Sequence, residues 1–141
     1  MSERVFIDTN ILIYAEDADA GPKGVLAEKV LKSLILSGQA VLSTQVLQEF
    51  FTVATRKLKL PAEVARMRVE TYAQLDVILL RPELILSAID LHRLRPISFW
   101  DALIIRAAAV SGCSRLLSED LQHGQLIDGV RIENPFHPAT P

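Results

Sequence analysis

The chain has 141 residues, of which 50% are hydrophobic and 23% charged, and its net charge is −2 at neutral pH. This length suits one domain, because a chain of this size buries roughly 68–70% of its unfolded surface. The near-neutral charge argues against a protein that coats nucleic acid non-specifically, and the single cysteine excludes an intramolecular disulfide. No apolar stretch reaches about 18 residues and no secretory leader pattern opens the chain, so we expect a cytoplasmic protein without a membrane segment.

Short apolar, β-branched runs predict the strands. In chain order they cover residues 4–7, 40–43, 76–80, 115–118 and, more briefly, 130–134. Between them, apolar residues recur at helical spacing over 24–38 and 44–58, and 98–112 is apolar almost all round. Pro61 and Pro82 stand where the first turn of a helix accepts proline. This alternation predicts one α/β domain with a mostly parallel sheet of four or five strands.

The predicted domain takes up the whole chain, 1–141. Its only linker-like piece is a short Pro-rich C-terminal tail at about 134–141, which we expect at the surface. Cys113 closes an apolar run, so we expect a small buried hydrophobe rather than a reactive thiol.

Four acidic residues are predicted at one edge of the sheet. Asp8 and Asp120 each follow a predicted strand, Glu49 lies early in the helix after 40–43, and Asp101 is in the first turn of its own helix. In parallel sheets the ligand crevice lies outside the carboxyl ends of the strands. The coarse fold therefore brings acids from distant parts of the chain to one crevice.

Each acid also has an ordinary structural explanation. Asp8 can cap the helix that follows it, and Asp101 can close a capping box at the start of its helix. Glu49 can be a surface residue that borders the apolar stripe of its helix. Asp120 can belong to a polar turn, in which Glu119 could replace it as a ligand. Their common location, rather than any one residue, indicates a site.

Clustered carboxylates are unfavourable unless a cation balances them. Two unit charges ~4 Å apart at an effective dielectric of ~20 repel by about 4 kcal/mol. Oxygen ligands suit Mg²⁺ or Mn²⁺ rather than structural zinc, and such metals promote in-line displacement at phosphorus. The pattern predicts phosphodiester hydrolysis, with Asp8, Glu49, Asp101 and Asp120 as both metal ligands and catalytic residues.

Four segments carry a family pattern: they read FIDTNILIY, LQEFFTVATRK, SFWDALIIRAAAVSGCSRLLSEDLQHGQ and GVRIENPF. Together they resemble the PIN-domain family, and within it the VapC-like toxins of bacterial type II toxin–antitoxin systems. The resemblance covers nearly the whole chain and is most specific in the last third. It implies a three-layer α/β/α fold and a metal-dependent endoribonuclease that cleaves single-stranded or looped RNA with the four acids named above.

The resemblance also implies roles for polar neighbours and partners. Asn10 and Ser118 match positions that orient ligands or water, and Glu119 is a further candidate for such a role. Members of the family usually form homodimers. They are silenced by a small cognate antitoxin protein that often inserts into the acidic cleft. We therefore expect RNA, an antitoxin and a second copy of the chain as partners.

Basic residues near the acids could contact RNA phosphates. Arg56 and Lys57 continue the helix of Glu49, while Arg93 and Arg95 lie just before the turn that holds Asp101. Basic residues also favour helix C-terminal ends for electrostatic reasons alone, so this assignment has a structural alternative.

The aromatic residues and one histidine have structural interpretations. Phe50, Phe51, Phe99 and Trp100 occur at helical spacing among aliphatic residues, which predicts a core or homodimer interface rather than base stacking. His123 follows Asp120 closely, but we interpret it as a turn or surface residue outside the metal site.

Two other functions fit the same residues. The first is a non-catalytic RNA- or protein-binding module with the same fold. The second is a small phosphatase in which Asp8 acts as the nucleophile. That chemistry usually has a second acid two residues further on, where Asn10 stands here.

Overall fold

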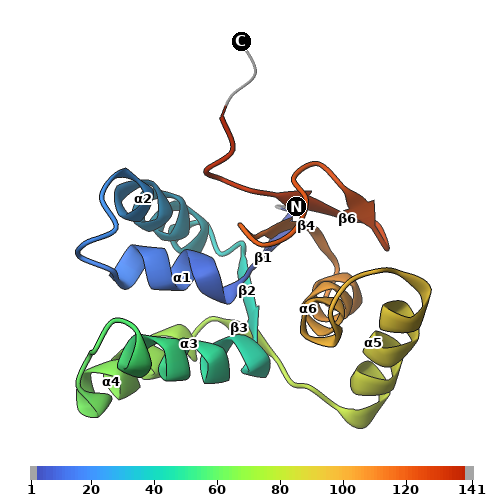
Figure 1. The fold of residues 1–141 in the computed structure, drawn as a ribbon, viewed down its shortest axis with the longest axis horizontal. Coiled ribbons are helices and arrows are strands. Elements are labelled where there is room, and N and C mark those ends of the chain that lie inside the picture. The colour runs from blue at the N-terminus through green and yellow to red at the C-terminus, as the bar shows by residue number, and fades with distance from the viewer. Residues whose placement is uncertain (1–2, 139–141) are drawn as a thin grey trace.

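A six-stranded sheet forms the centre of the structure, a computed structural model that describes residues 3–138 (Figure 1). The strands are β1 (Arg4–Ile7), β2 (Ala40–Ser43), β3 (Asp76–Ile78), β4 (Cys113–Leu117), β5 (Leu126–Ile127) and β6 (Val130–Glu133). Their spatial order is β3-β2-β1-β4-β6-β5, and every neighbouring pair is parallel except β5 and β6. The predicted α/β class with a mostly parallel sheet is confirmed.

Strand β5 is the element that the sequence pattern does not reveal. It is two residues long, too short for any periodicity to show, and it pairs with β6 through a tight turn. Asp128 and Gly129 in this turn have φ angles of 52° and 79°, the left-handed region that aspartate tolerates and glycine favours. The sheet therefore has six strands instead of the expected four or five.

Six helices cover the sheet. They are α1 (Thr9–Glu16), α2 (Pro22–Leu36), α3 (Thr44–Arg56), α4 (Ala62–Tyr72), α5 (Pro82–Leu94) and α6 (Phe99–Val110). In Figure 1, α1 to α4 lie on one side of the sheet and α5 and α6 on the other, which gives the expected three layers. Helix α6 packs against α5, β4 and β6, while α1 packs against α2 and α3. None of the helices in the described part of the chain combines the length and apolarity that a membrane span requires.

The core lies along β1 and α6. Val5, Phe6 and Ile7 of β1 are fully buried, as expected for a central parallel strand covered on both faces. The middle of α6 is also buried, so its interpretation as a central helix is confirmed. Cys113 at the start of β4 is buried too, as its apolar surroundings predict.

The aromatic residues do not share one environment. Phe50 belongs to the core and Phe99 packs against it, but Phe51 and Trp100 are exposed. A homodimer interface, the alternative that the sequence left open, stays a prediction for both residues. The core half of the interpretation is wrong, most clearly for Trp100. The reason is its place in the first turn of α6, where the helix reaches the rim of a pocket instead of the space between sheet and α5.

Part of the C-terminal tail lies against the domain. The ring of Phe136 meets Tyr14 of α1 edge-on, with 5.0 Å between ring centroids, and the ammonium of Lys23 is 5.4 Å from the Phe136 centroid. The predicted tail, about 134–141, thus contains one residue that docks on α1. Residues 139–141 lie outside the described part of the chain.

The middle and the C-terminal end of α6 provide a test of this packing. Ile105 is 0% exposed, so Ile105→Ala leaves a cavity and should lower the free energy of unfolding by about 2–5 kcal/mol. Val110, on the same helix, is 68% exposed, so Val110→Ala should change it by no more than about 0.5 kcal/mol. Urea denaturation of both variants beside the wild type measures the two values. Equal losses would contradict the placement of α6.

Candidate active site

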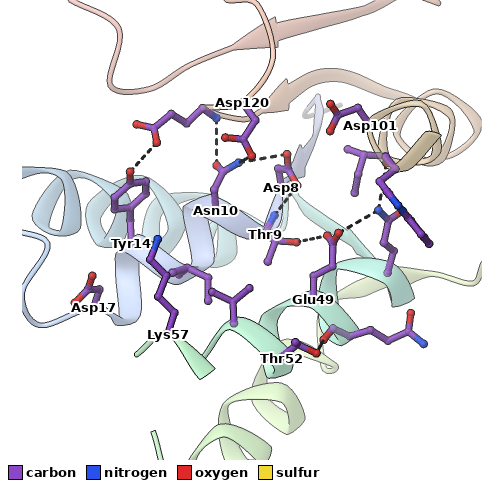
Figure 2. A pocket seen from close by; sticks show the side chains of 17 residues that line it. Asp8, Thr9, Asn10, Tyr14, Asp17, Glu49, Thr52, Lys57, Asp101 and Asp120 are labelled. Carbon is purple, nitrogen blue, oxygen red and sulfur yellow. Dashed lines mark hydrogen bonds between the residues drawn. The ribbon is translucent and has the colours of Figure 1, made fainter. Parts of the chain in front are cut away.

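A pocket of about 690 Å³ opens beside the carboxyl ends of β1, β2 and β4. Strand β1 lies between β2 and β4. The helices that follow β1 cover one face of the sheet and the helix that precedes β4 covers the other (Figure 1), so a crevice opens at the carboxyl end of β1. The four predicted acids line the pocket: Asp8 and Asp120 follow β1 and β4, Glu49 lies in α3 and Asp101 in α6 (Figure 2). Its other polar or aromatic lining residues are Thr9, Asn10, Tyr14, Asp17, Gln45, Gln48, Thr52, Lys57, Trp100 and Glu119.

Asp8 both caps a helix and lines the pocket. It follows β1 directly and is only 6% exposed. One carboxylate oxygen accepts a 2.7 Å hydrogen bond from the Thr9 N–H at the start of α1, and the other accepts one of 2.8 Å from the Ser118 hydroxyl. Burial raises the pKa of Asp8 to about 7, against the effect of these hydrogen bonds, and the negative charges of Glu49 and Asp120 add to the rise. The capping explanation and the site explanation therefore apply together.

Asn10 and Ser118 connect the ends of β1 and β4. The Asn10 amide donates to a carboxylate oxygen of Asp120 at 3.1 Å, and its own oxygen accepts from the Glu119 N–H at 3.2 Å. The Ser118 hydroxyl, which donates to Asp8, also accepts from the Asp120 N–H at 3.2 Å. Both residues thus orient the acids at these strand ends, which is the location that the sequence predicts for them.

Glu49 reaches the pocket from α3. Its Oε1 accepts a 2.7 Å hydrogen bond from the Thr9 hydroxyl, and the Gln45 amide lies 3.5 Å from its Oε2. The same amide donates to the backbone oxygen of Trp100 at 3.2 Å, so Gln45 links α3 to the first turn of α6. Glu49 is half-buried, in agreement with its predicted position at the border of the apolar stripe.

Asp101 stands in the first turn of α6. Its backbone N–H donates to the Ser98 hydroxyl at 3.0 Å, so Ser98 caps the helix and the Asp101 carboxylate lines the pocket. Burial raises the pKa of Asp101, the Ser98 hydroxyl opposes the rise, and the charge of Asp120 adds to it. Asp101 and Asp120 are thus electrostatically coupled across the pocket.

Glu119 is held on the side of the pocket formed by α1 and α2. Its carboxylate accepts a 2.6 Å hydrogen bond from the Tyr14 hydroxyl and forms an ion pair with Lys23. Burial would raise the pKa of Glu119, but the hydrogen bonds from Lys23 and Tyr14 outweigh it and the pKa is lowered. Both carboxylate oxygens of Glu119 are therefore occupied, whereas Asp120 turns toward Asn10.

The predicted RNA-binding residues separate into two groups. Lys57 lines the pocket, and its charge contributes to the low pKa of Glu119. Arg56, at the end of α3, and Arg93 and Arg95, at the end of α5, are exposed but do not line it. His123 also lies outside the pocket lining, where its ring nitrogen accepts a hydrogen bond from the Asn134 N–H.

Several lining residues escape sequence reasoning. Thr9 stands beside Asp8 in the chain, and Gln45 precedes Glu49 by one helical turn, so a hydroxyl or amide next to a candidate acid is the signal that could have found them. Tyr14 and Lys23 contact Glu119 from about a hundred residues away in the chain. Nothing local in the sequence indicates that contact.

The donor set suits a hard divalent cation in its chemistry. All the acids offer oxygen, and the buried Asp8 carboxylate is destabilised as an anion by burial and by its acidic neighbours, an effect that a cation would reverse. Within residues 3–138, however, no three His, Cys, Asp or Glu side chains are grouped closely enough to hold a metal ion. In this arrangement Glu49, Asp120 and Asp8 instead accept hydrogen bonds from Thr9, Asn10 and Ser118, respectively.

The fold and the site define an α/β/α domain with an acidic pocket at the switch point of a parallel sheet. Residues 5–126 match the family model of the PIN domain, and the chain belongs to this family. The family predicted from the sequence is confirmed. No curated protein matches the sequence.

Solved structures share the fold. A chain of the toxin–antitoxin complex from Klebsiella pneumoniae is 21% identical with a TM-score of 0.69, over 94% of this chain and 98% of that chain. VapC20 from Mycobacterium tuberculosis, described as a sarcin–ricin loop cleaving toxin, is 23% identical with a TM-score of 0.64, over 82% and 91% of the two chains. FitAcB from Neisseria gonorrhoeae is 16% identical with a TM-score of 0.70, over 95% and 99%.

The raised pKa of Asp8 predicts a pH-dependent stability in the absence of divalent metal. The folded protein keeps the Asp8 proton up to about pH 7, whereas the unfolded chain releases it near its ordinary pKa of 3.8. Between these values the folded state binds more protons, so this residue lowers the free energy of unfolding by about 1.4 kcal/mol for each pH unit of increase.

The variant Asp8→Asn isolates this contribution because it cannot titrate. In EDTA, the free energy of unfolding of Asp8→Asn minus that of the wild type should rise between about pH 4 and pH 7 and then level off. If the new amide interacts differently with Thr9 and Ser118, this changes the difference by the same amount at every pH and leaves its dependence on pH unchanged. Urea denaturation across the pH range measures it, and a flat difference would show that Asp8 titrates normally.

Proposed function

We propose that this PIN domain is a Mg²⁺- or Mn²⁺-dependent endoribonuclease that hydrolyses phosphodiester bonds of RNA. The observation that carries the proposal is that Asp8, Glu49, Asp101 and Asp120, from four separate segments of the chain, line one pocket. Several acids along one pocket, one of them a buried carboxylate, oppose stability unless the site serves a cation. Family membership supports the same chemistry.

The residues that would hold the metal are Asp8, Asp101 and Asp120, with Glu49 as a further ligand or as a base for water. When bound, the cation would lower the pKa of a water molecule and stabilise negative charge on a phosphoryl oxygen. The donor set fits this role because it offers oxygen atoms alone. Glu49 accepts from the Thr9 hydroxyl through one oxygen, and its second oxygen has only the 3.5 Å contact with Gln45.

The polar neighbours keep the acids in place. Ser118 donates to Asp8 and accepts from the backbone of Asp120, and Asn10 donates to the Asp120 side chain. These contacts fix carboxylates that would otherwise repel one another and turn outward. Tyr14 of α1 and Lys23 of α2 hold the Glu119 carboxylate, whereas the neighbouring Asp120 carboxylate faces Asn10.

The biological role that we propose is the toxin of a type II toxin–antitoxin pair, active in the cytoplasm. The shared fold with a chain of the toxin–antitoxin complex from Klebsiella pneumoniae, over nearly the full length of both chains, and with the toxin VapC20 from Mycobacterium tuberculosis supports this proposal. A cognate antitoxin would neutralise the protein, and two copies would form a homodimer. A small gene directly beside this one, with a product that copurifies with this chain, is the expected companion.

Asp101→Asn tests the catalytic proposal. The helix cap uses the Asp101 backbone N–H and the Ser98 hydroxyl, so the substitution preserves it and the protein should fold normally. With Mn²⁺ or Mg²⁺, RNA cleavage should fall at least about a hundredfold, because a carboxylate of the metal site is lost. EDTA should stop cleavage by the wild type.

The matched control is Asp90→Asn. Asp90 is exposed on α5 and does not line the pocket, so this variant loses one negative charge elsewhere and should cleave like the wild type. Equal cleavage by the wild type and Asp101→Asn would indicate a contaminating nuclease. Retained RNA binding without cleavage by any of the three proteins would favour the non-catalytic RNA-binding module.

A further inference from the structure

Trp100 is the only tryptophan of the chain, and it lies where substrate would approach the acids. The residue is 61% exposed and lines the same pocket as the four carboxylates. It directly precedes Asp101 in the first turn of α6. A large aromatic side chain that is exposed to water lacks the stabilisation that burial would give it. A ligand that covers the ring would supply this stabilisation.

Neighbouring groups hold this residue in position. Its backbone oxygen accepts the 3.2 Å hydrogen bond from Gln45, a side chain that is only 3% exposed. Its ring meets Phe99, which packs against the core, with 5.1 Å between centroids and 70° between ring planes. This edge-to-face contact restrains the indole while most of the residue stays exposed.

The charge of the pocket decides what can cover the ring. The acids repel phosphate groups. Contacts between the RNA backbone and the acids therefore cannot supply the affinity for the side of the pocket where Trp100 lies. Nucleobases are neutral, and each offers a π-face that stacks on aromatic rings. Lys57 lies across the pocket from Asp101 in Figure 2 and can attract a phosphate on that side. The pocket therefore has an aromatic wall for a base and a cationic wall for the backbone.

We propose that Trp100 stacks on an unpaired base of the RNA, next to the phosphate that enters the acidic pocket. This inference rests on the proposed ribonuclease function and adds a residue that contacts the substrate. A base can reach the ring only when it is unstacked from its own strand, so Trp100 supplies a physical reason for the preference for single-stranded or looped RNA that the family resemblance implies. Trp100 is then a substrate-binding residue that acts independently of the metal.

The single tryptophan makes the contact directly measurable. In EDTA, which prevents metal-dependent cleavage, a short single-stranded oligoribonucleotide should quench the tryptophan fluorescence saturably. The same sequence in a fully paired duplex should quench much less at equal concentration. Fluorescence anisotropy of the labelled oligoribonucleotide gives an independent binding curve with the same midpoint.

Variants separate stacking from general damage. Trp100→Ala should bind the labelled oligoribonucleotide about tenfold or more weakly, whereas Trp100→Phe, which keeps a ring, should regain most of the affinity. Leu36→Ala is the matched control, since it truncates an exposed apolar residue of α2 that lies outside the pocket, and it should bind like the wild type. Rescue by phenylalanine is the readout that a merely structural role of Trp100 would not give.

The outcomes distinguish this inference from the ribonuclease proposal. Quenching of the wild type and loss of affinity in Trp100→Ala, without cleavage by the wild type in any metal, would support the base contact and refute the enzyme. Metal-dependent cleavage with unchanged affinity in Trp100→Ala would refute the base contact alone. No binding by either readout, both for the wild type in EDTA and for the cleavage-deficient Asp101→Asn variant with Mg²⁺, would also refute it, because in the second case the cation offsets the repulsion between the acids and the phosphate. Emission that depends on protein concentration but not on RNA would show that a second copy covers the ring, and would overturn the inference.

Discussion

The site depends on a buried carboxylate at the end of the central strand. Asp8 follows three fully buried residues of β1, so the backbone cannot move it outward without disturbing the core. Burial makes its charge costly, as its raised pKa shows, and the Thr9 N–H and Ser118 hydroxyl offset only part of that cost. Such a residue is not explained by helix capping alone, because an exposed aspartate caps equally well without this penalty.

The order of the strands determines which groups meet Asp8. Because β1 pairs with β2 on one side and β4 on the other, the segments that leave these strands converge on its carboxyl end. The segment after β4 supplies Ser118 and Asp120, and α3 after β2 supplies Glu49. Hydrogen bonds from Asn10 and Thr9, both in the first turn of α1, then link these segments. One short stretch of chain thus organises acids that are far apart in the sequence.

The sequence reveals the parts of this arrangement that depend on local pattern. Strand ends placed Asp8 and Asp120, helix spacing placed Glu49, and the cap at Ser98 placed Asp101. All four residues line the pocket as predicted, whereas Asp17, a further acid of the lining, was not predicted. What it could not reveal are contacts between distant side chains. Tyr14 and Lys23 hold Glu119 through such contacts, and the exposure of Trp100 depends on where α6 begins relative to the sheet. Strand β5 was missed for a different reason, since two residues carry no period.

Gln45 gives the pocket a connection between its acidic and aromatic walls. One amide nitrogen faces both the Glu49 carboxylate and the backbone oxygen of Trp100, so a shift of α6 relative to α3 would disturb both contacts. The Gln45 side chain is almost fully buried, and a buried amide that loses its partners is costly. This coupling favours one fixed spacing between the exposed ring and Glu49. A pocket that must place a flexible single strand against fixed carboxylates needs such a constraint, because a misplacement of about 1 Å can slow a reaction by two orders of magnitude.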